Sequence, residues 1–137
     1  MIVVDSSALI AILRREPEAD DFLRIVAGTE NCLLSSVSLL ETSMVLAGRT
    51  GDQRSWAALD ALLSRAGMQI VAQDSEQAEA ARTAFLGFGK GRHPAALNLG
   101  DCASYALAKA RNLPLLFKGD DFSKTDLDDA GPRFGRP

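Results

Sequence analysis

Five acidic residues lie at or shortly after the apolar runs of this sequence, and they are the side chains best suited to chemistry. In an α/β protein with a parallel sheet, ligands bind outside the carboxyl ends of the strands, so acids delivered there from four parts of the chain can share one pocket. A pocket of carboxylates without basic partners favours a hard divalent cation. These acids are Asp5, Glu41, Asp101, Asp120 and Asp121.

The chemistry that suits this set of carboxylates is metal-assisted hydrolysis of a phosphodiester. Crowded carboxylates repel one another unless cations neutralise them or some of them bind protons. Mg²⁺ prefers oxygen ligands and usually keeps several waters, so the pocket has room for one ion or two. A bound metal ion supplies a nucleophilic hydroxide and stabilises charge on a phosphoryl oxygen.

Each acid also has a purely structural alternative. Asp5 could cap the helix that follows it. Glu41 could be the acid of a capping box that begins at Ser38. Asp101 stands three residues after Asn98, a candidate cap, and the two remaining acids could be turn residues. The joint pattern favours a site, because all these positions face the same edge of a doubly wound sheet.

The elements that would position these acids alternate between short apolar strands and helices. This alternation predicts right-handed crossovers, a parallel sheet and an α/β sandwich. Predicted strands cover residues 2–4, 32–35, 68–72 and 114–117, with a further short strand near 125–127. Predicted helices cover residues 6–15, 17–28, from Ser38 to Gly48 or Gly51, from the cap Asp52 to Gly67, from the cap Asp74 or Ser75 over 76–86, and 99–111.

Length and composition indicate one soluble domain over residues 1–137. The chain has 47% apolar and 24% charged residues, which is typical of a globular protein. No apolar run is long enough to span a membrane, and we find no secretory signal after Met1. Cys32 and Cys102 lie in apolar surroundings, which favours reduced core thiols and a cytoplasmic protein.

Positive charge is segregated from the acids, although the formal net charge is −3. No acid occurs between Ala80 and Gly100, a segment that contains Lys90, Arg92 and His93. We expect Lys90, Arg92 and Lys118 to contact phosphates of a nucleic acid, with His93 as a weaker candidate. The alternative is an ordinary solvated loop.

Other motifs do not fit the sequence. No GxGxxG follows the first strand, which argues against a dinucleotide. The glycine-rich segment 87–91 lacks the Gly-Lys-Ser/Thr ending of a P-loop. His93 is the only histidine, so a zinc site or a Ser-His-Asp triad is not expected. The segment after Asp5 lacks the second Asp of phosphatases that form an aspartyl-phosphate.

Four segments in order carry a resemblance to a known family. The segments are Val4-Asp5-Ser6-Ser7-Ala8-Leu9, Ser38-Leu-Leu-Glu41, Asn98-Leu-Gly-Asp101-Cys-Ala-Ser-Tyr105-Ala-Leu-Ala and Leu115-Leu-Phe-Lys-Gly-Asp120-Asp121-Phe122. Together they cover nearly the whole chain, and they resemble a PIN domain, more narrowly a VapC-type toxin ribonuclease.

This resemblance implies a Rossmann-like three-layer α/β/α sandwich with a short parallel sheet and Mg²⁺- or Mn²⁺-dependent endoribonuclease activity. It also implies a homodimer and a small cognate antitoxin that inserts into the active cleft. By position, Asp5 and Asp101 become the primary metal ligands, and Glu41 holds a second ion or positions the attacking water. The fourth acid falls at Asp120 or Asp121, and Ser7 is a candidate hydrogen-bonding partner of these ligands.

Two non-catalytic alternatives remain at this stage. A response-regulator receiver has similar size and strand-end acids, but it needs an acidic pair after the first strand and a phosphorylatable Asp after the third. Here Asp5 stands alone, and Asp74 has the neighbours of a helix cap. A PIN-like protein that binds RNA without cutting it is the other. Residues for a dimer or antitoxin surface, or else for the core, are Leu33, Leu39, Val45, Leu46 and Trp56.

Overall fold

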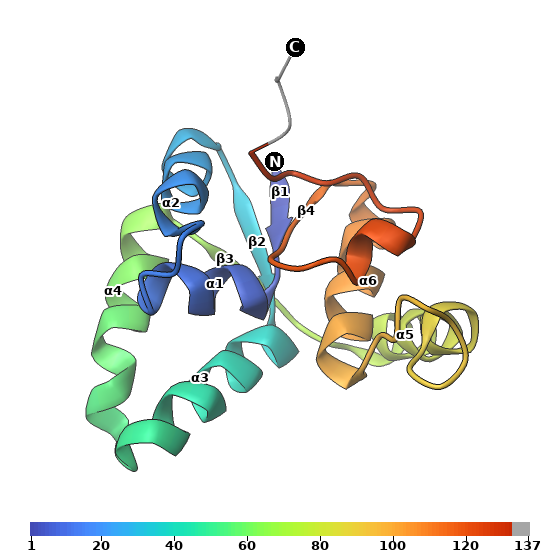
Figure 1. Cartoon of the computed structure of the whole chain (residues 1–137), viewed down its shortest axis with the longest axis horizontal. Coiled ribbons are helices and arrows are strands. Elements are labelled where there is room, and N and C mark those ends of the chain that lie inside the picture. The colour runs from blue at the N-terminus through green and yellow to red at the C-terminus, as the bar shows by residue number, and fades with distance from the viewer. Residues whose placement is uncertain (133–137) are drawn as a thin grey trace.

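The core of the protein is a sheet of four parallel strands in the order β3-β2-β1-β4 (Figure 1). The computed structural model describes residues 1–132, apart from the side chains of residues 49 and 50. Val3 pairs with Leu33 on one side and with Leu115 on the other. The predicted α/β fold with a short parallel sheet is therefore confirmed. The strands are β1 (Ile2–Val4), β2 (Cys32–Ser35), β3 (Gln69–Val71) and β4 (Leu115–Leu116).

Helices cover both faces of this sheet and make three layers. Figure 1 shows α1, α2 and α4 on one side of the strands and α5 and α6 on the other, with α3 below. Of these helices, none within residues 1–132 has both the length and the apolar character needed to cross a membrane. The helices are α1 (Ser6–Leu13), α2 (Ala19–Gly28), α3 (Ser36–Thr50), α4 (Ala57–Ala66), α5 (Ser75–Phe88) and α6 (Leu99–Arg111), with 3₁₀ turns η1 (Gln53–Trp56) and η2 (Phe122–Lys124).

Alternation along β1 explains why both faces are covered. Ile2 and Val4 belong to the apolar cluster that includes side chains of α1, α2 and α4, whereas Val3 belongs to the cluster with α5 and α6. Buried side chains of this kind stabilise the fold by roughly 1.5–3 kcal/mol each. Cys32 and Cys102 are buried free thiols, as predicted, and burial raises the pKa of each thiol.

The strand order places a topological switch point between β1 and β4. From β1 the chain moves to β2 and then to β3 at one edge, and β4 is added on the other side of β1. Ligands of open α/β sheets bind in the crevice beyond the carboxyl ends of the two strands at such a point. Asp5 directly follows β1, and Asp120 and Asp121 follow β4, so both segments lead into this crevice.

The start of α3 differs from the prediction. Its cap is Ser35, whose hydroxyl accepts a hydrogen bond from the N–H of Val37, and the helix begins at Ser36. The predicted cap Ser38 was wrong: it is fully buried within the helix. Gly48 lies inside the helix, which instead ends at Gly51 in the left-handed conformation (φ 77°) that glycine adopts most readily.

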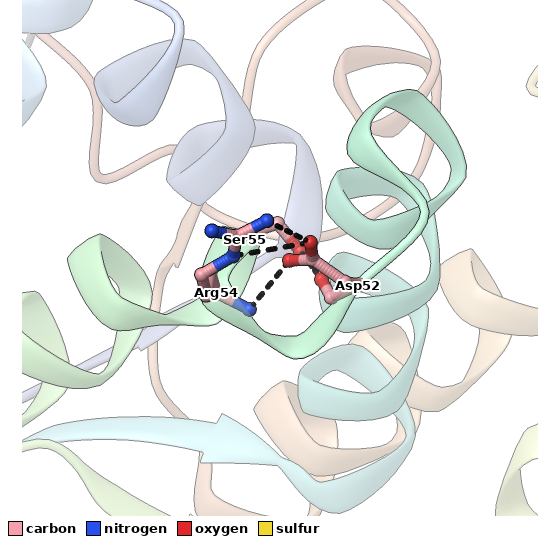
Figure 2. A network of polar contacts seen from close by, with 3 residues as sticks. All are labelled: Asp52, Arg54 and Ser55. Atoms are coloured by element: carbon pink, nitrogen blue, oxygen red, sulfur yellow. Dashed lines mark hydrogen bonds and ion pairs between the residues drawn. The ribbon is translucent and has the colours of Figure 1, made fainter.

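Asp52 begins the next element, as predicted, but through a 3₁₀ turn that precedes α4. Figure 2 shows its carboxylate accepting hydrogen bonds from the backbone N–H of Arg54 at 2.9 Å and from the guanidinium at 2.8 Å. The hydroxyl of Ser55 donates to the Asp52 carbonyl. Hydrogen bonding to the Arg54 side chain lowers the pKa of Asp52. This exposed cluster serves the local turn and has no contact with the acids of the site.

Two further boundaries also differ from the prediction. The helix expected from Pro17 begins at Ala19. The strand expected near residues 125–127 is wrong, since a bend and an irregular residue follow η2 there. Instead, Leu115 of β4 donates to the carbonyl of Asp128 and accepts from the N–H of Ala130, so this segment covers the outer edge of the sheet.

Candidate active site

Asp5 lies buried at the end of β1, with 1% of its surface exposed. Its Oδ2 accepts hydrogen bonds from the N–H of Ser7 at 3.0 Å and from the Ser7 hydroxyl at 2.6 Å. Its Oδ1 accepts from the hydroxyl of Ser104 on α6 at 2.6 Å. Asp5 therefore does cap α1, but capping uses one oxygen only, and its burial is compensated by hydroxyl groups rather than by a cation. The expected contact with Ser7 is confirmed.

A buried pair of serines holds Asp5 from the side of α6. Ser104 and Ser38 are both fully buried, and their hydroxyl oxygens lie 3.0 Å apart. Because a serine has one hydroxyl proton and Ser104 donates it to Asp5, Ser38 must donate to Ser104. Sequence reasoning missed both roles. The available signal was a serine one helical turn after Asp101 on an otherwise apolar helix face.

Ser104→Ala should lower Mn²⁺ affinity or RNA cleavage by roughly 10–100-fold, the usual effect of removing a partner that orients a metal ligand. It should also cost about 1–3 kcal/mol of stability, because Asp5 and Ser38 lose a buried partner. Calorimetric Mn²⁺ titration and denaturant unfolding measure the two effects. Ser43→Ala is the matched control, since that hydroxyl bonds only to the Leu39 carbonyl of its own helix. Equal metal affinity in both variants would exclude the orienting role.

Glu41 lies in the second turn of α3, not in the first turn as expected, because the helix begins two residues before Ser38. Its Oε1 accepts a hydrogen bond from the Ser6 hydroxyl at 2.7 Å. On its other side the carboxylate rests against Gly100 in the first turn of α6. Glu41 also borders a groove of about 360 Å³ between α3 and α6, which is lined mainly by apolar side chains.

Asp101 carries the clearest sign that the acids converge. The pKa of Asp101 is raised to about 6, mainly by burial and to a smaller extent by the charges of Asp5, Glu41 and Asp121, while a hydrogen bond from the backbone N–H of Asn98 lowers it. The same hydrogen bond closes a capping box with Asn98, so Asp101 both starts α6 and belongs to the acidic cluster. We call Asp5, Glu41, Asp101 and Asp121 the acidic cluster.

The loop after β4 brings in the last member of this cluster. Asp120 and Asp121 are both exposed and precede η2. The charge of Asp121 acts on Asp101, whereas Asp120 is not among the charges that raise this pKa. The backbone N–H of Lys118 donates to the Ser7 hydroxyl at 3.0 Å, which ties this loop to the end of β1 across the switch point.

The acidic cluster has the donor chemistry of a site for a hard divalent ion. Its members are carboxylates from four separate segments, and none of the lysine and arginine side chains that the structure describes forms an ion pair with them. No three acid, histidine or cysteine side chains of the described residues are close enough together to hold an ion as they stand.

The basic candidates are less closely tied to the acids. Lys90 and Arg92 lie exposed in the loop that precedes α6, and the Arg92 guanidinium donates to the Leu86 carbonyl at 3.4 Å. His93 accepts from the N–H of Ala95 through Nδ1, which gives it a role within this loop. Lys118 contacts the site through its backbone, as described above. Its ammonium group pairs with Glu16 at 3.0 Å and Glu18 at 3.5 Å.

The residues suggested for a dimer or antitoxin surface divide between core and surface. Leu33 is fully buried in the sheet, so the core alternative holds for it. Trp56 is 37% exposed, and its indole N–H donates to the Ser43 carbonyl. The most exposed apolar side chains beside the site were not predicted. They are Leu40, Met44 and Leu99, at 60%, 65% and 79% exposure, and all three line the groove next to Glu41.

Comparison with known proteins agrees with this fold. Residues 2–127 match the PIN domain. Ribonuclease VapC30 of Mycobacterium tuberculosis is 48% identical over 126 residues, which cover 92% of this chain and 95% of that protein. Two solved structures share the fold, and the predicted resemblance and the three-layer sandwich are confirmed.

The first of these structures is VapC20 of Mycobacterium tuberculosis, a toxin that cleaves the sarcin-ricin loop. It matches with a TM-score of 0.76 and 21% identity over 96% of this chain and 100% of that chain. The second is a toxin-antitoxin complex from Klebsiella pneumoniae, which matches with a TM-score of 0.67 and 19% identity over 92% of this chain and 93% of that chain.

Proposed function

Because the chain belongs to the PIN domain family, we propose that it is the endoribonuclease toxin of a toxin–antitoxin pair and that its acidic cluster holds Mg²⁺. The observation that carries the proposal is geometric: Ser104 of α6, the helix of Asp101, donates to Asp5 at the end of β1, and Glu41 lies against Ser6 and against Gly100 at the start of the same helix. The VapC30 relative, a ribonuclease, supports RNA as the substrate.

The members of the acidic cluster have different tasks in this proposal. Asp5 and Asp101 are the primary ligands of the ion, since Asp5 is buried at the end of β1 and Asp101 is half-buried on α6, the helix that packs against β1. Glu41 holds a second ion or orients the attacking water. Asp121, rather than Asp120, is the fourth acid, because its charge is the one that acts on Asp101. Mn²⁺ is expected to substitute for Mg²⁺, since both accept oxygen ligands.

A divalent ion at this position supplies a water of lowered pKa and stabilises charge on the phosphoryl oxygens. The protein's own contribution is positioning. Ser7 and Ser104 fix the two oxygens of Asp5, and Ser6 fixes Oε1 of Glu41. Asp121 is exposed, so it lies at the entrance from which a phosphodiester would approach.

A small antitoxin and a second copy of the chain are the proposed protein partners. The Klebsiella pneumoniae neighbour is a toxin-antitoxin complex, which supports an antitoxin that enters the cleft of this protein. The exposed side chains of Leu40, Met44 and Leu99 form an apolar surface of the kind that a homodimer buries. Both partners act next to Glu41, at the rim of the acidic cluster.

The receiver alternative fails on topology. A receiver has the strand order 2-1-3-4-5, in which β3 lies beside β1. Here β3 pairs with β2 at the edge of the sheet, and Asp74 caps α5 by accepting from the N–H of Gln77 at 2.8 Å. RNA binding without cleavage is disfavoured because such a protein has no need of four converging carboxylates.

The test of the proposed function is expression of the protein with and without the neighbouring small reading frame, followed by mapping of cleaved RNA ends. New RNA ends should appear only when the small protein is absent. With purified protein, EDTA should stop the cleavage, and Mg²⁺ or Mn²⁺ should restore it. Cleavage that continues in EDTA would contradict the metal-dependent mechanism.

Lys118→Ala should weaken RNA binding several-fold and lower the slope of log affinity against log salt by about 0.7, the value for one phosphate contact on single-stranded RNA. Fluorescent single-stranded RNA and the Asp101→Asn protein in EDTA allow binding to be measured without cleavage. Arg65→Ala is the charge-matched control, because Arg65 is exposed on the last turn of α4, before β3 begins. Equal salt slopes for the two variants would remove Lys118 from the RNA site.

A further inference from the structure

Gly100 occupies the place where α6 comes closest to the Glu41 carboxylate. A Cβ atom added to Gly100 would lie 2.5 Å from Oε2 and 2.6 Å from Cδ of Glu41, and closer still to Oε1. Real Cβ atoms almost never approach other heavy atoms within 3.0 Å. The carboxylate of Glu41 therefore occupies space that exists only because residue 100 has no side chain.

The other side of the same carboxylate is also fixed. The hydroxyl of Ser6, which is itself buried, donates to Oε1 of Glu41 at 2.7 Å. Glu41 is thus held between a hydroxyl at the start of α1 and the bare backbone at the start of α6. An acid that reaches the cluster from α3 through a flexible side chain gains a defined position from these two neighbours.

The backbone at Gly100 does not itself require glycine. Its φ is not in the positive range, unlike that of Gly51, Gly67, Gly91 and Gly119. Within α6, alanine has the higher helix propensity. The three atoms nearest to an added methyl group are the terminal atoms of the Glu41 side chain, which can turn away at little cost. Glycine is therefore required at position 100 because it leaves space for the Glu41 carboxylate, and not because the helix backbone requires it.

We infer that Gly100 is a positioning residue that sets where Glu41 presents its carboxylate to the acidic cluster. The inference rests on the proposed metal-dependent function and adds one residue to it. Gly100 touches neither substrate nor metal in this account and acts only through Glu41. A displacement of about 1 Å in a reacting or orienting group is enough to lower a rate by about 100-fold.

The test is Gly100→Ala, with Gly48→Ala as the matched control. Gly48 lies in α3, the helix of Glu41, and an added Cβ there would meet nothing within 4 Å. Gly100→Ala should lower the Mg²⁺-dependent cleavage of total cellular RNA, followed at the mapped ends, by about 10–100-fold. It should weaken calorimetric Mn²⁺ binding while leaving the denaturant midpoint in EDTA near that of wild type. Gly48→Ala should change neither cleavage nor Mn²⁺ binding.

A double-mutant cycle with Glu41→Gln separates action through Glu41 from general damage. In the Glu41→Gln background, Gly100→Ala should change cleavage and Mn²⁺ binding by less than about twofold. The same loss in both backgrounds, a fall in stability large enough to unfold the variant, or wild-type behaviour of Gly100→Ala would each overturn the inference. If wild-type protein cleaves no RNA, the proposed function fails, and Mn²⁺ binding still decides whether Gly100 positions Glu41.

Discussion

Asp5→Asn is expected to lower the rate of RNA cleavage by more than about 100-fold, because changes in outer partners of a metal ligand already cost 10–100-fold. The amide removes the negative charge and places an NH₂ group at one of the two positions to which Ser7 and Ser104 donate hydrogen bonds. Asparagine still caps a helix as well as aspartate does, so the start of α1 is retained. Cleavage at the mapped RNA ends with Mg²⁺ measures the effect, and Asp101→Asn should give a loss of similar size.

The control for this experiment is Asp74→Asn. Asp74 also follows a strand and also caps a helix, but its carboxylate lies outside the acidic cluster and accepts from Gln77. Its substitution should leave cleavage within a few-fold of wild type. An Asp5→Asn protein that is folded and cleaves RNA at the wild-type rate would show that the buried carboxylate is only a cap.

In EDTA, Asp101 should make the protein less stable as the pH rises from about 4 to above 6. Its pKa is about 6 in the folded protein and near 3.8 in the unfolded chain, so the folded state binds the proton more tightly. The stabilisation is complete below pH 4 and is lost as the pH rises through the folded-state pKa. The difference between the two pKa values corresponds to at most about 3 kcal/mol, reduced by partial exposure of Asp101 to solvent.

Denaturant unfolding at several pH values between 4 and 7 tests this dependence. At each pH, the unfolding free energy of Asp101→Asn is subtracted from that of wild type, which removes the contribution of the other carboxylates. This difference should fall as the pH rises. In the proposed function, Mg²⁺ binds the ionised cluster of the folded protein, so its addition should raise the melting temperature near neutral pH. A difference that is constant with pH would refute the raised pKa of Asp101 in the folded protein.

The parts of the fold that were predictable have local causes. The helix over residues 99–111 was predicted with both ends correct, because Asn98 caps its start and Asn112 adopts the left-handed conformation (φ 53°) at its end. The strand-end positions of Asp5 and of the Asp120–Asp121 pair likewise follow from short apolar runs and a parallel sheet. Because ligands of parallel sheets bind beyond the carboxyl ends of the strands, these acids can be predicted to lie near one site without knowledge of any side-chain contact.

The start of α3 could not be predicted from the local sequence. Ser35, Ser36 and Ser38 all have side chains that can cap a helix, and only tertiary packing separates them. Ser38 is buried against Ser104, 66 residues later in the chain, and this burial excludes it as a cap. The cap is instead Ser35, three residues before the predicted cap, and the helix begins at Ser36. This change moves Glu41 from the first to the second turn. No sequence pattern around Ser38 indicates this distant partner.

The choice between two neighbouring acids and the role of Gly100 were also beyond local reasoning. Asp120 and Asp121 have the same chemistry and the same exposure, and the turn before η2 decides which charge acts on Asp101. A glycine beside a helix cap has many possible explanations in sequence. Only the position of the Glu41 carboxylate, which arrives from another helix, identifies the space that Gly100 leaves free.

The pairing of β1 with β4 determines when nuclease activity first becomes available during translation. Asp5 precedes its partner Ser104 by 99 residues, and β4 must also emerge before β1 has both neighbours. Chains leave the ribosome at about 5–20 residues per second. A nascent chain that stops before α6 carries Asp5 and Glu41 without Asp101 or Asp121, so the toxin stays inert until its late segments have left the exit tunnel.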